Sequence, residues 1–120
     1  MAAAPVVHFE ILGQDAKKLQ DFYSKLFDWN MNVMEEMQYG LVEKTEKGIG
    51  GGVGATQPGM PGYVTIYMAV DNTDEYLKKA EALGGKTVMP TTVIPGMVTF
   101  ALFSDPEGHL VGLVNNEMPA

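Results

Sequence analysis

The chain of 120 residues contains no cysteine. Disulfide bridges, thiolate metal sites and cysteine nucleophiles are therefore excluded. No apolar run approaches the roughly 20 residues that a helix needs to span a bilayer. The first five residues also lack the basic and apolar regions of a secretory signal. Together these absences lead us to expect a cytoplasmic protein that does not enter a membrane.

Positive charge is scarce, with 8 Lys and Arg residues against 15 Asp and Glu residues and a formal net charge of −7 at pH 7. An acidic surface repels phosphate backbones, so we expect no nucleic-acid partner. Such a surface would attract a cationic ligand, but acidity more often serves only to keep a protein soluble.

The first half of the chain predicts a strand, a helix and three further strands. Residues 6–12 form a β-branched and aromatic run that is typical of a strand. Asp15 can then accept hydrogen bonds from the free amides at the start of a helix, and apolar residues recur at helical spacing over residues 16–27. The three following strands are expected over residues 32–37, 39–45 and 49–55.

The second half repeats this order after residues 57–62, which hold two prolines and two glycines and predict a linker. Asn72 with Glu75 predicts the start of a helix, and Gly84-Gly85 predicts its end. Strands are expected over residues 63–70, 87–89, 97–104 and 109–115, with Pro90 ending the second of them and a loop or edge segment over 91–95.

The spacing of corresponding signals supports an internal repeat. Val6 and Tyr63 both open a strand, and Asp15 and Asn72 both cap a helix, and the members of each pair are 57 positions apart. Repeated spacing of this kind indicates repeated structural units. The predicted fold is therefore α+β, with two βαβββ modules.

We expect a single domain over residues 1–120, with module one at 6–56, a linker at 57–62 and module two at 63–115. Each module would cover one sheet face with its helix and leave the other face concave. Two such faces set together would form a cleft suited to a small molecule. A dimeric αβ barrel of ferredoxin-like βαββ units is the alternative, but it does not explain the late DPEG strand as well.

Six stretches, read together, resemble one protein family. They span residues 6–114 and read VVHFEI, FYSKLFDW, GIGGGV, VDN, KKAEALGGK and DPEGHLVGLV. The pairing of EALGGK with DPEG across a hydrophobic strand is the most specific feature. The chain is similar to the vicinal oxygen chelate superfamily, which contains glyoxalases, bleomycin-resistance proteins and extradiol dioxygenases.

The resemblance implies paired βαβββ units around a cup-shaped cavity, where many members hold a divalent metal through His, Gln or Glu side chains of the first and last strands. On this chain the ligand positions fall on His8, Thr65, Gly112 and either Gly51 or Gly52. One good ligand of four remains, whereas a catalytic metal normally has about three protein ligands. We therefore expect no cofactor and no standard metal site, with a divalent metal as the less favoured alternative.

Side chains that alternate along the two first strands are the candidate ligand-binding residues. His8 and Glu10 share a strand face, where they could act as an acid/base pair, as ligands of a non-standard metal site, or as partners across strands or in a dimer interface. A carboxylate so placed is expected to raise the pKa of the imidazole. Thr65 and Tyr67 occupy the matching face of the second module, although Tyr67 could equally be a core tyrosine.

Tyr39 and Phe100 are weaker candidates for the same pocket, because the face that each occupies on its strand is uncertain. His109 follows the DPEG turn, where a role in starting the last strand is favoured over ligation. The glycines of IGGGVG do not precede a helix or a Lys-Ser/Thr pair, which argues against a phosphate loop. They are more typical of close backbone approach, and here they would leave space in the cavity.

The sequence favours two functions over a third, a purely structural or interaction protein, which explains the polar residues of the cup less well. The first is a glyoxalase-like enzyme, a lyase, isomerase or dioxygenase acting on a small molecule through His8 and Glu10. The second is a metal-free protein that sequesters a drug or metabolite, as bleomycin-resistance proteins do. In either case we expect a small-molecule ligand, no nucleic acid, no membrane and a homodimer, because chains of this size in the family often pair with a second copy.

Overall fold

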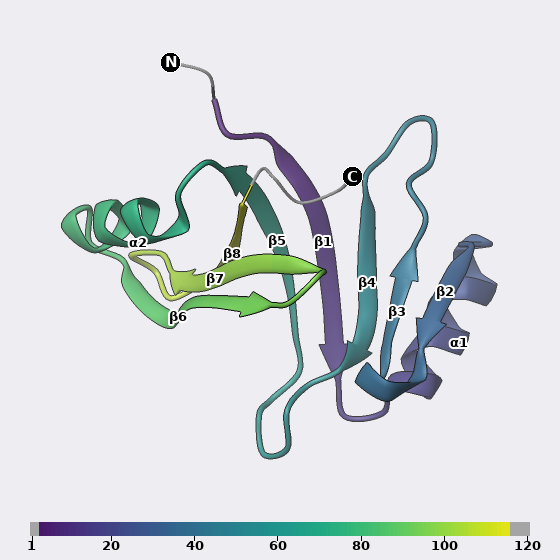
Figure 1. Cartoon of the computed structure of the whole chain (residues 1–120). Helices are drawn as coiled ribbons and strands as arrows, with labels where there is room; N and C mark the ends of the chain where they lie inside the picture. The colour runs from purple at the N-terminus through teal and green to yellow at the C-terminus, as the bar shows by residue number, and fades with distance from the viewer. Residues whose placement is uncertain (1–2, 116–120) are drawn as a thin grey trace. The chain divides into compact units, whose positions relative to one another are not determined.

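A computed structural model describes residues 3–115 of the chain (Figure 1). It contains eight strands and two α-helices in the order βαβββ followed by βαβββ, so the predicted α+β class with two such modules is confirmed. By contacts, the described residues divide into two compact units, one made of His8–Thr65 and the other of residues 3–7 and 66–115. No helix within the described residues is long and apolar enough to cross a membrane.

The first unit places four strands in the order β2-β3-β4-β1. Strand β4 lies parallel to β1 and antiparallel to β3, which makes β4 a central strand with a neighbour on each side. The elements are β1 (Val6–Gly13), α1 (Ala16–Phe27), β2 (Met31–Met34), the 3₁₀ turn η1 (Glu35–Met37), β3 (Tyr39–Val42) and β4 (Gly50–Ala55).

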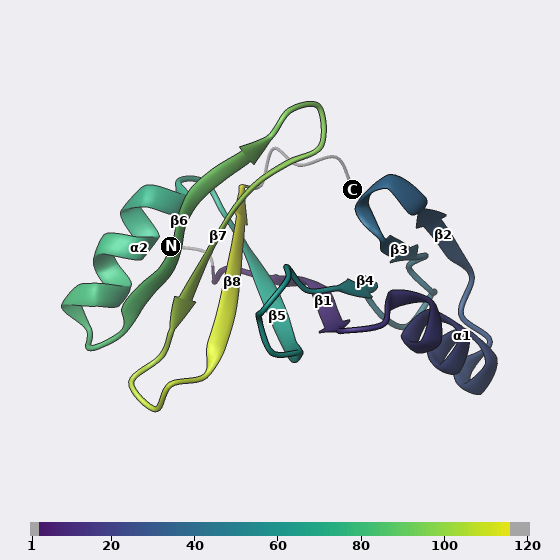
Figure 2. The ribbon, with the colours of Figure 1, turned by 90° about the horizontal axis from the view of Figure 1, so that it is seen from below.

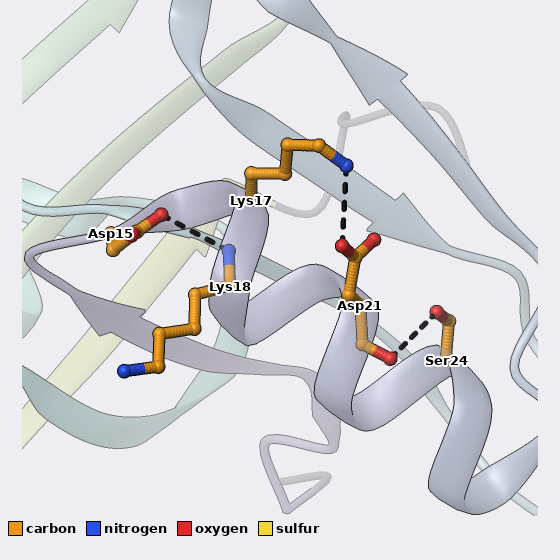
Figure 3. A network of polar contacts seen from close by, with 5 residues as sticks. All are labelled: Asp15, Lys17, Lys18, Asp21 and Ser24. Atoms are coloured by element: carbon orange, nitrogen blue, oxygen red, sulfur yellow. Dashed lines mark hydrogen bonds and ion pairs between the residues drawn. The ribbon is translucent and has the colours of Figure 1, made fainter.

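Helix α1 begins as the sequence predicts. The Asp15 side chain accepts a hydrogen bond from the Lys18 backbone amide at 3.1 Å, and Lys17 forms an ion pair with Asp21 one turn later (Figure 3). The helix also contacts β4, where the buried Gln20 amide nitrogen donates to the Val53 carbonyl at 2.9 Å. This contact gives the Val53 carbonyl of a central strand a hydrogen-bond donor and holds the helix over one face of the unit's sheet.

The second unit places its strands in the order β5-β8-β7-β6, with α2 beside β6, β7 and β8. Figure 2 shows β6 and β7 as a long hairpin. The buried cluster under α2 joins Val70, Leu77, Ala101 and Leu113, and Asn72 caps the helix as predicted. The elements are β5 (Tyr63–Val70), α2 (Thr73–Ala82), β6 (Lys86–Ile94), β7 (Val98–Ser104) and β8 (Leu110–Asn115).

Three predicted strands are wrong in their extent. The strand expected over 39–45 ends at Val42. The strand expected over 32–37 ends at Met34, because the chain turns through η1 and Gln38 adopts a left-handed conformation with φ 51° before β3. The strand expected to end at Pro90 continues to Ile94 with two register shifts against β7. Strand β6 is the outer strand of its unit, where a proline removes no ladder hydrogen bond if its nitrogen faces away from the sheet.

Candidate functional site

Four side chains of the first unit form a continuous hydrogen-bonded group, which we call the Glu10 cluster: His8, Glu10, Tyr39 and Tyr63. The Tyr39 hydroxyl lies 2.9 Å from His8 Nε2 and donates to Glu10 Oε2 at 2.8 Å. The Tyr63 hydroxyl donates to Glu10 Oε1 at 3.3 Å. The Glu10 residue is only 8% exposed, so these hydroxyls supply hydrogen bonds that a buried carboxylate needs.

Strand alternation explains why His8 and Glu10 meet Tyr39 while Phe9 does not. Phe9 points toward the helix side, where its ring lies 5.1 Å from that of Trp29. His8 and Glu10 point to the opposite face, as the period of two predicts. Their shared contact with Tyr39 confirms that prediction.

Tyr39 comes from β3, yet it reaches Glu10 on β1, so its side chain crosses the intervening strand β4. It does so over Gly52, which lies beside Glu10 in the parallel register of β1 and β4. A Cβ atom at Gly52 would fall on the hydroxyl oxygen and Cζ of Tyr39. The Tyr39 ring therefore occupies the space that the missing side chain of Gly52 leaves, whereas the sequence predicted that the glycine run would leave that space to the cavity.

The direction of each hydrogen bond assigns the state of His8. Because Tyr39 has one hydroxyl proton and donates it to Glu10, its oxygen must accept from His8. His8 Nε2 therefore carries a hydrogen in this network.

Burial shifts the pKa values of three members of the cluster. It lowers the pKa of His8 below the ordinary value of 6.5, so the expectation of a raised histidine pKa is wrong. The reason is that desolvation disfavours the imidazolium. Burial, followed by the charge of Glu10, raises the pKa of both Tyr39 and Tyr63. The two phenols are thus held in the protonated, donating form.

The remaining predicted site residues divide between the units. Thr65 belongs to the first unit and is buried. Tyr67 is buried in the second unit against Leu102 and Val114, and Phe100 packs against the same cluster. The structure therefore brings together His8, Glu10 and Tyr39 in one unit, and Tyr67 with Phe100 in the other. Their role in binding a ligand stays a prediction.

Tyr63 is a member of the cluster that is not among the predicted site residues. It lies two residues before Thr65 on β5, so the alternation that selected Thr65 and Tyr67 also selects Tyr63. The signal was therefore present in the strand pattern. What the pattern lacked was the long-range contact to Glu10.

The side chains at the family's metal positions do not fit a metal. A Cβ atom at Gly112 would fall on the ring of Tyr67, its neighbour in the register of β5 and β8. A Cβ atom at Gly52 meets Tyr39 in the same way. Neither position has room for a carboxylate while the tyrosine stays in place. Within residues 3–115, no group of three or more His, Asp or Glu side chains is arranged to hold a metal ion.

His109 lies outside the Glu10 cluster and stabilises the turn before β8. Its backbone amide donates to Asp105 Oδ1 at 3.0 Å, and its Nδ1 lies 2.9 Å from Asp105 Oδ2. Hydrogen bonds from the backbone amide and ring of His109 and from the Glu107 amide hold the pKa of the Asp105 carboxyl below its usual value. This geometry fits the favoured prediction that His109 helps to start the last strand.

An open cleft of about 670 Å³ lies next to α1 in the first unit. Lys17, Gln20, Trp29, Met31 and Gln38 are among the residues that line it. None of the predicted site residues lines this cleft, and it contains no histidine. We therefore take the Glu10 cluster, which has linked titratable groups, as the candidate functional site.

Comparison with known proteins identifies relatives for almost the whole chain. Residues 6–113 match the model of the Glyoxalase/Bleomycin resistance protein/Dioxygenase superfamily. CFP32 of Mycobacterium bovis, named as a glyoxylase, is 29% identical over 85 residues, which cover 71% of this chain and 33% of that protein. The anthracycline biosynthesis protein DnrV of Streptomyces peucetius is 28% identical over 117 residues, covering 83% of this chain and 42% of DnrV. The chain thus matches well under half the length of these relatives.

Solved structures share the fold. A superfamily member from Vibrio splendidus superposes with a TM-score of 0.63 at 14% identity, covering 94% of this chain and 99% of that one. Methylmalonyl-CoA epimerase from Mycobacterium tuberculosis superposes with a TM-score of 0.66 at 14% identity, covering 100% and 93%. Together with the family match over residues 6–113, this shows that the chain belongs to the Glyoxalase/Bleomycin resistance protein/Dioxygenase superfamily.

Proposed function

We propose that this protein binds a small organic molecule at the Glu10 cluster through hydrogen bonds, without the metal that many members of its superfamily hold. The observation that carries the proposal is the buried Glu10 carboxylate, held by the hydroxyls of Tyr39 and Tyr63 and linked through Tyr39 to His8. Buried titratable groups joined in this way cluster at functional sites more than elsewhere in proteins.

The hydrogen-bond directions favour a particular kind of ligand. Tyr39 and Tyr63 give their hydroxyl protons to Glu10, and His8 Nε2–H is directed at the Tyr39 oxygen. These hydroxyl and Nε2–H protons are therefore already donated to other members of the cluster, whereas the phenol oxygens keep lone pairs that can accept a hydrogen bond. A ligand that carries N–H or O–H donors complements such a site better than one that carries only acceptors.

Catalysis of a glyoxalase-like kind is one form of this proposal. The low pKa of His8 leaves the imidazole neutral near pH 7, which is the form that can accept a proton from a substrate. The glyoxylase name of CFP32 supports testing an isomerase or lyase reaction first. A dioxygenase reaction receives less support, because the side chains at the family's metal positions do not fit the metal.

Sequestration of a drug or metabolite is the second candidate. The anthracycline biosynthesis name of DnrV connects a relative with a large organic molecule. The net charge of −7 and the acceptor character of the cluster would both suit a basic compound. Binding without turnover would separate this candidate from the enzyme.

Metal analysis with a ligand screen tests the proposal. Purified protein is incubated with Ni²⁺, Zn²⁺, Mn²⁺ or Fe²⁺, desalted and assayed for metal, with His8→Ala as the test variant and His109→Ala as the control. We expect no stoichiometric metal in any of the three proteins. Stoichiometric metal that is lost in His8→Ala alone would overturn the metal-independent proposal.

The ligand arm uses two probes, a methylglyoxal hemithioacetal and an anthracycline, in thermal-shift and turnover assays. We expect at least one probe to raise the melting temperature of the wild type and of His109→Ala but not of Tyr39→Ala. Turnover of the hemithioacetal would favour the enzyme, whereas stabilisation without turnover would favour sequestration. Equal stabilisation of all three proteins would contradict binding at the cluster.

We also propose that the protein forms a homodimer through the exposed apolar side of α1. Phe22, Leu26 and Phe27 are each more than half exposed although the helical spacing predicts them for a buried face. Contiguous exposed apolar side chains often mark a protein interface. Leu26→Glu should shift the species measured by light scattering from dimer to monomer, whereas Leu83→Glu, at an exposed residue next to α2, should not. A monomeric wild type would refute this proposal.

A cytoplasmic location remains part of the proposal. It rests on the complete lack of cysteine in the sequence, which is typical of proteins that need no disulfides. Cell fractionation of the native host with an antibody to the protein would test it.

A further inference from the structure

Gly52 occupies a special place on β4, between the strand that carries Tyr39 and the strand that carries Glu10. In the register of β3 and β4 it lies opposite Leu41, and in that of β4 and β1 it lies opposite Glu10. Neighbouring strands are about 4.8 Å apart, so a side chain that starts on β3 must pass over β4 to reach β1. Tyr39 makes this crossing with its ring above Gly52.

We propose that Gly52 is a positioning residue of the site. Because it has no side chain, the Tyr39 ring can lie over it, and this keeps the Tyr39 hydroxyl between His8 and Glu10. The three nearest atoms to a Cβ built at Gly52 are the hydroxyl oxygen, Cζ and Cε2 of Tyr39. An alanine there would meet the hydroxyl end of the Tyr39 side chain, which could stay in contact with neither His8 nor Glu10 without overlapping the added methyl group. Tyr39 would have to leave, and the link from His8 to Glu10 would break with it.

The second unit also contains a strand glycine covered by a tyrosine ring, although there the tyrosine comes from the adjacent strand and crosses none. Gly112 on β8 lies opposite Tyr67 on β5, and a Cβ atom at Gly112 would meet Cδ2, Cε2 and Cγ of that ring. In both units a glycine on the last strand therefore admits a tyrosine ring. A glycine within a strand normally weakens it, so its presence at these two places is explained by the tyrosine that it accommodates.

Gly51 supplies a matched control. It precedes Gly52 on β4, and a Cβ atom there would meet the ring of Phe9. Phe9 lies on the helix side of the sheet with Trp29, so Gly51→Ala crowds an aromatic ring without touching Tyr39. Gly52→Ala and Gly51→Ala should thus cost similar stability, roughly 5–10 °C in melting temperature by overpacking, but only Gly52→Ala should disturb the cluster.

The test follows the imidazole of His8 by NMR in labelled protein without any ligand, with His8→Gln used to assign its signals. In the wild type and in Gly51→Ala we expect a fixed Nε2–H tautomer and a titration below pH 6.5. In Gly52→Ala we expect loss of the fixed tautomer and a titration that moves up toward 6.5, because displacing the Tyr39 ring opens His8 to water. An unchanged tautomer and titration in Gly52→Ala would overturn the proposal.

A double variant keeps the test decisive if Gly52→Ala does not fold. With Tyr39→Ala in the background, the added methyl group meets no ring, so most of the loss caused by Gly52→Ala should disappear. If the double variant also fails to fold while Tyr39→Ala folds, the proposal is wrong, because the conflict then lies elsewhere.

The inference rests on the proposed function in taking the Glu10 cluster as the binding site. Its test contains no ligand, however. Failure of both probes to bind would count against the function and leave the NMR result intact. A Gly52→Ala protein with an undisturbed cluster would refute the positioning role even if the wild type binds a probe.

Discussion

The substitution Tyr39→Phe removes one hydroxyl from the centre of the Glu10 cluster and leaves the aromatic ring in place. That hydroxyl makes a bond of 2.8 Å to the Glu10 carboxylate and one of 2.9 Å to His8. A hydrogen bond to a charged group contributes about 1.5–3 kcal/mol and one between neutral groups about 0.5–1.5 kcal/mol. The two together set an upper limit of about 4.5 kcal/mol.

The expected loss is smaller than this limit. Glu10 keeps the Tyr63 hydroxyl as a donor, and Tyr39 and His8 are only partly buried, so water can replace some of the lost bonding. We expect Tyr39→Phe to lower the free energy of unfolding by about 2 kcal/mol. For a chain of this length that corresponds to a fall of roughly 6–10 °C in melting temperature.

Urea denaturation followed by the fluorescence of Trp29, the single tryptophan, measures this loss, with circular dichroism as a second probe. Tyr23→Phe is the matched control, because the Tyr23 hydroxyl has no hydrogen bond to a described residue. Tyr63→Phe should fall between the two, since its bond to Glu10 is longer, at 3.3 Å. A Tyr39→Phe protein as stable as Tyr23→Phe would refute the reasoning.

Three further changes have defined outcomes. Because the pKa of His8 is lower in the folded protein than in the unfolded chain, the unfolded chain binds a proton more readily below pH 6.5. The free energy of unfolding should therefore fall as the pH drops below that value. His8→Gln should flatten this part of a pH–stability curve, and His109→Gln should not. The raised pKa of Tyr39 gives stability that is present below pH 10 and lost at higher pH, so Tyr39→Phe should unfold less steeply in an alkaline titration. Gly112→Ala should lower the free energy of unfolding by about 1–3 kcal/mol through overpacking against Tyr67, and a loss no larger than experimental error in chemical denaturation would contradict this.

Local signals predicted the elements well where the governing rule is local. The caps at Asp15 and Asn72 lie where the sequence predicts them, because each cap needs only an oxygen three residues before a free amide. The extent of β6 was harder to predict. Pro90 ends a strand only when its nitrogen is needed in the ladder, and the order of strands that makes β6 an outer one depends on contacts far along the chain.

The candidate site likewise has features that follow from local sequence patterns and features that depend on the packed structure. The shared face of His8 and Glu10 follows from the alternation of a single strand, and the loss of ligands at the metal positions follows from Gly112 and Thr65 in the sequence. The sign of the His8 pKa shift did not follow. Burial lowers the pKa of His8, and burial is a property of the packed protein.

The sequence by itself thus determined the order of the elements, the family and the shared strand face of His8 and Glu10 in the candidate site, since all of these depend on patterns within short segments. Only the tertiary structure decided that Tyr39 crosses β4 over Gly52 to link His8 with Glu10, and that Tyr63 joins them. The physical reason is that this link depends on the register of three strands and on the space above one glycine. No segment of the chain contains that information alone.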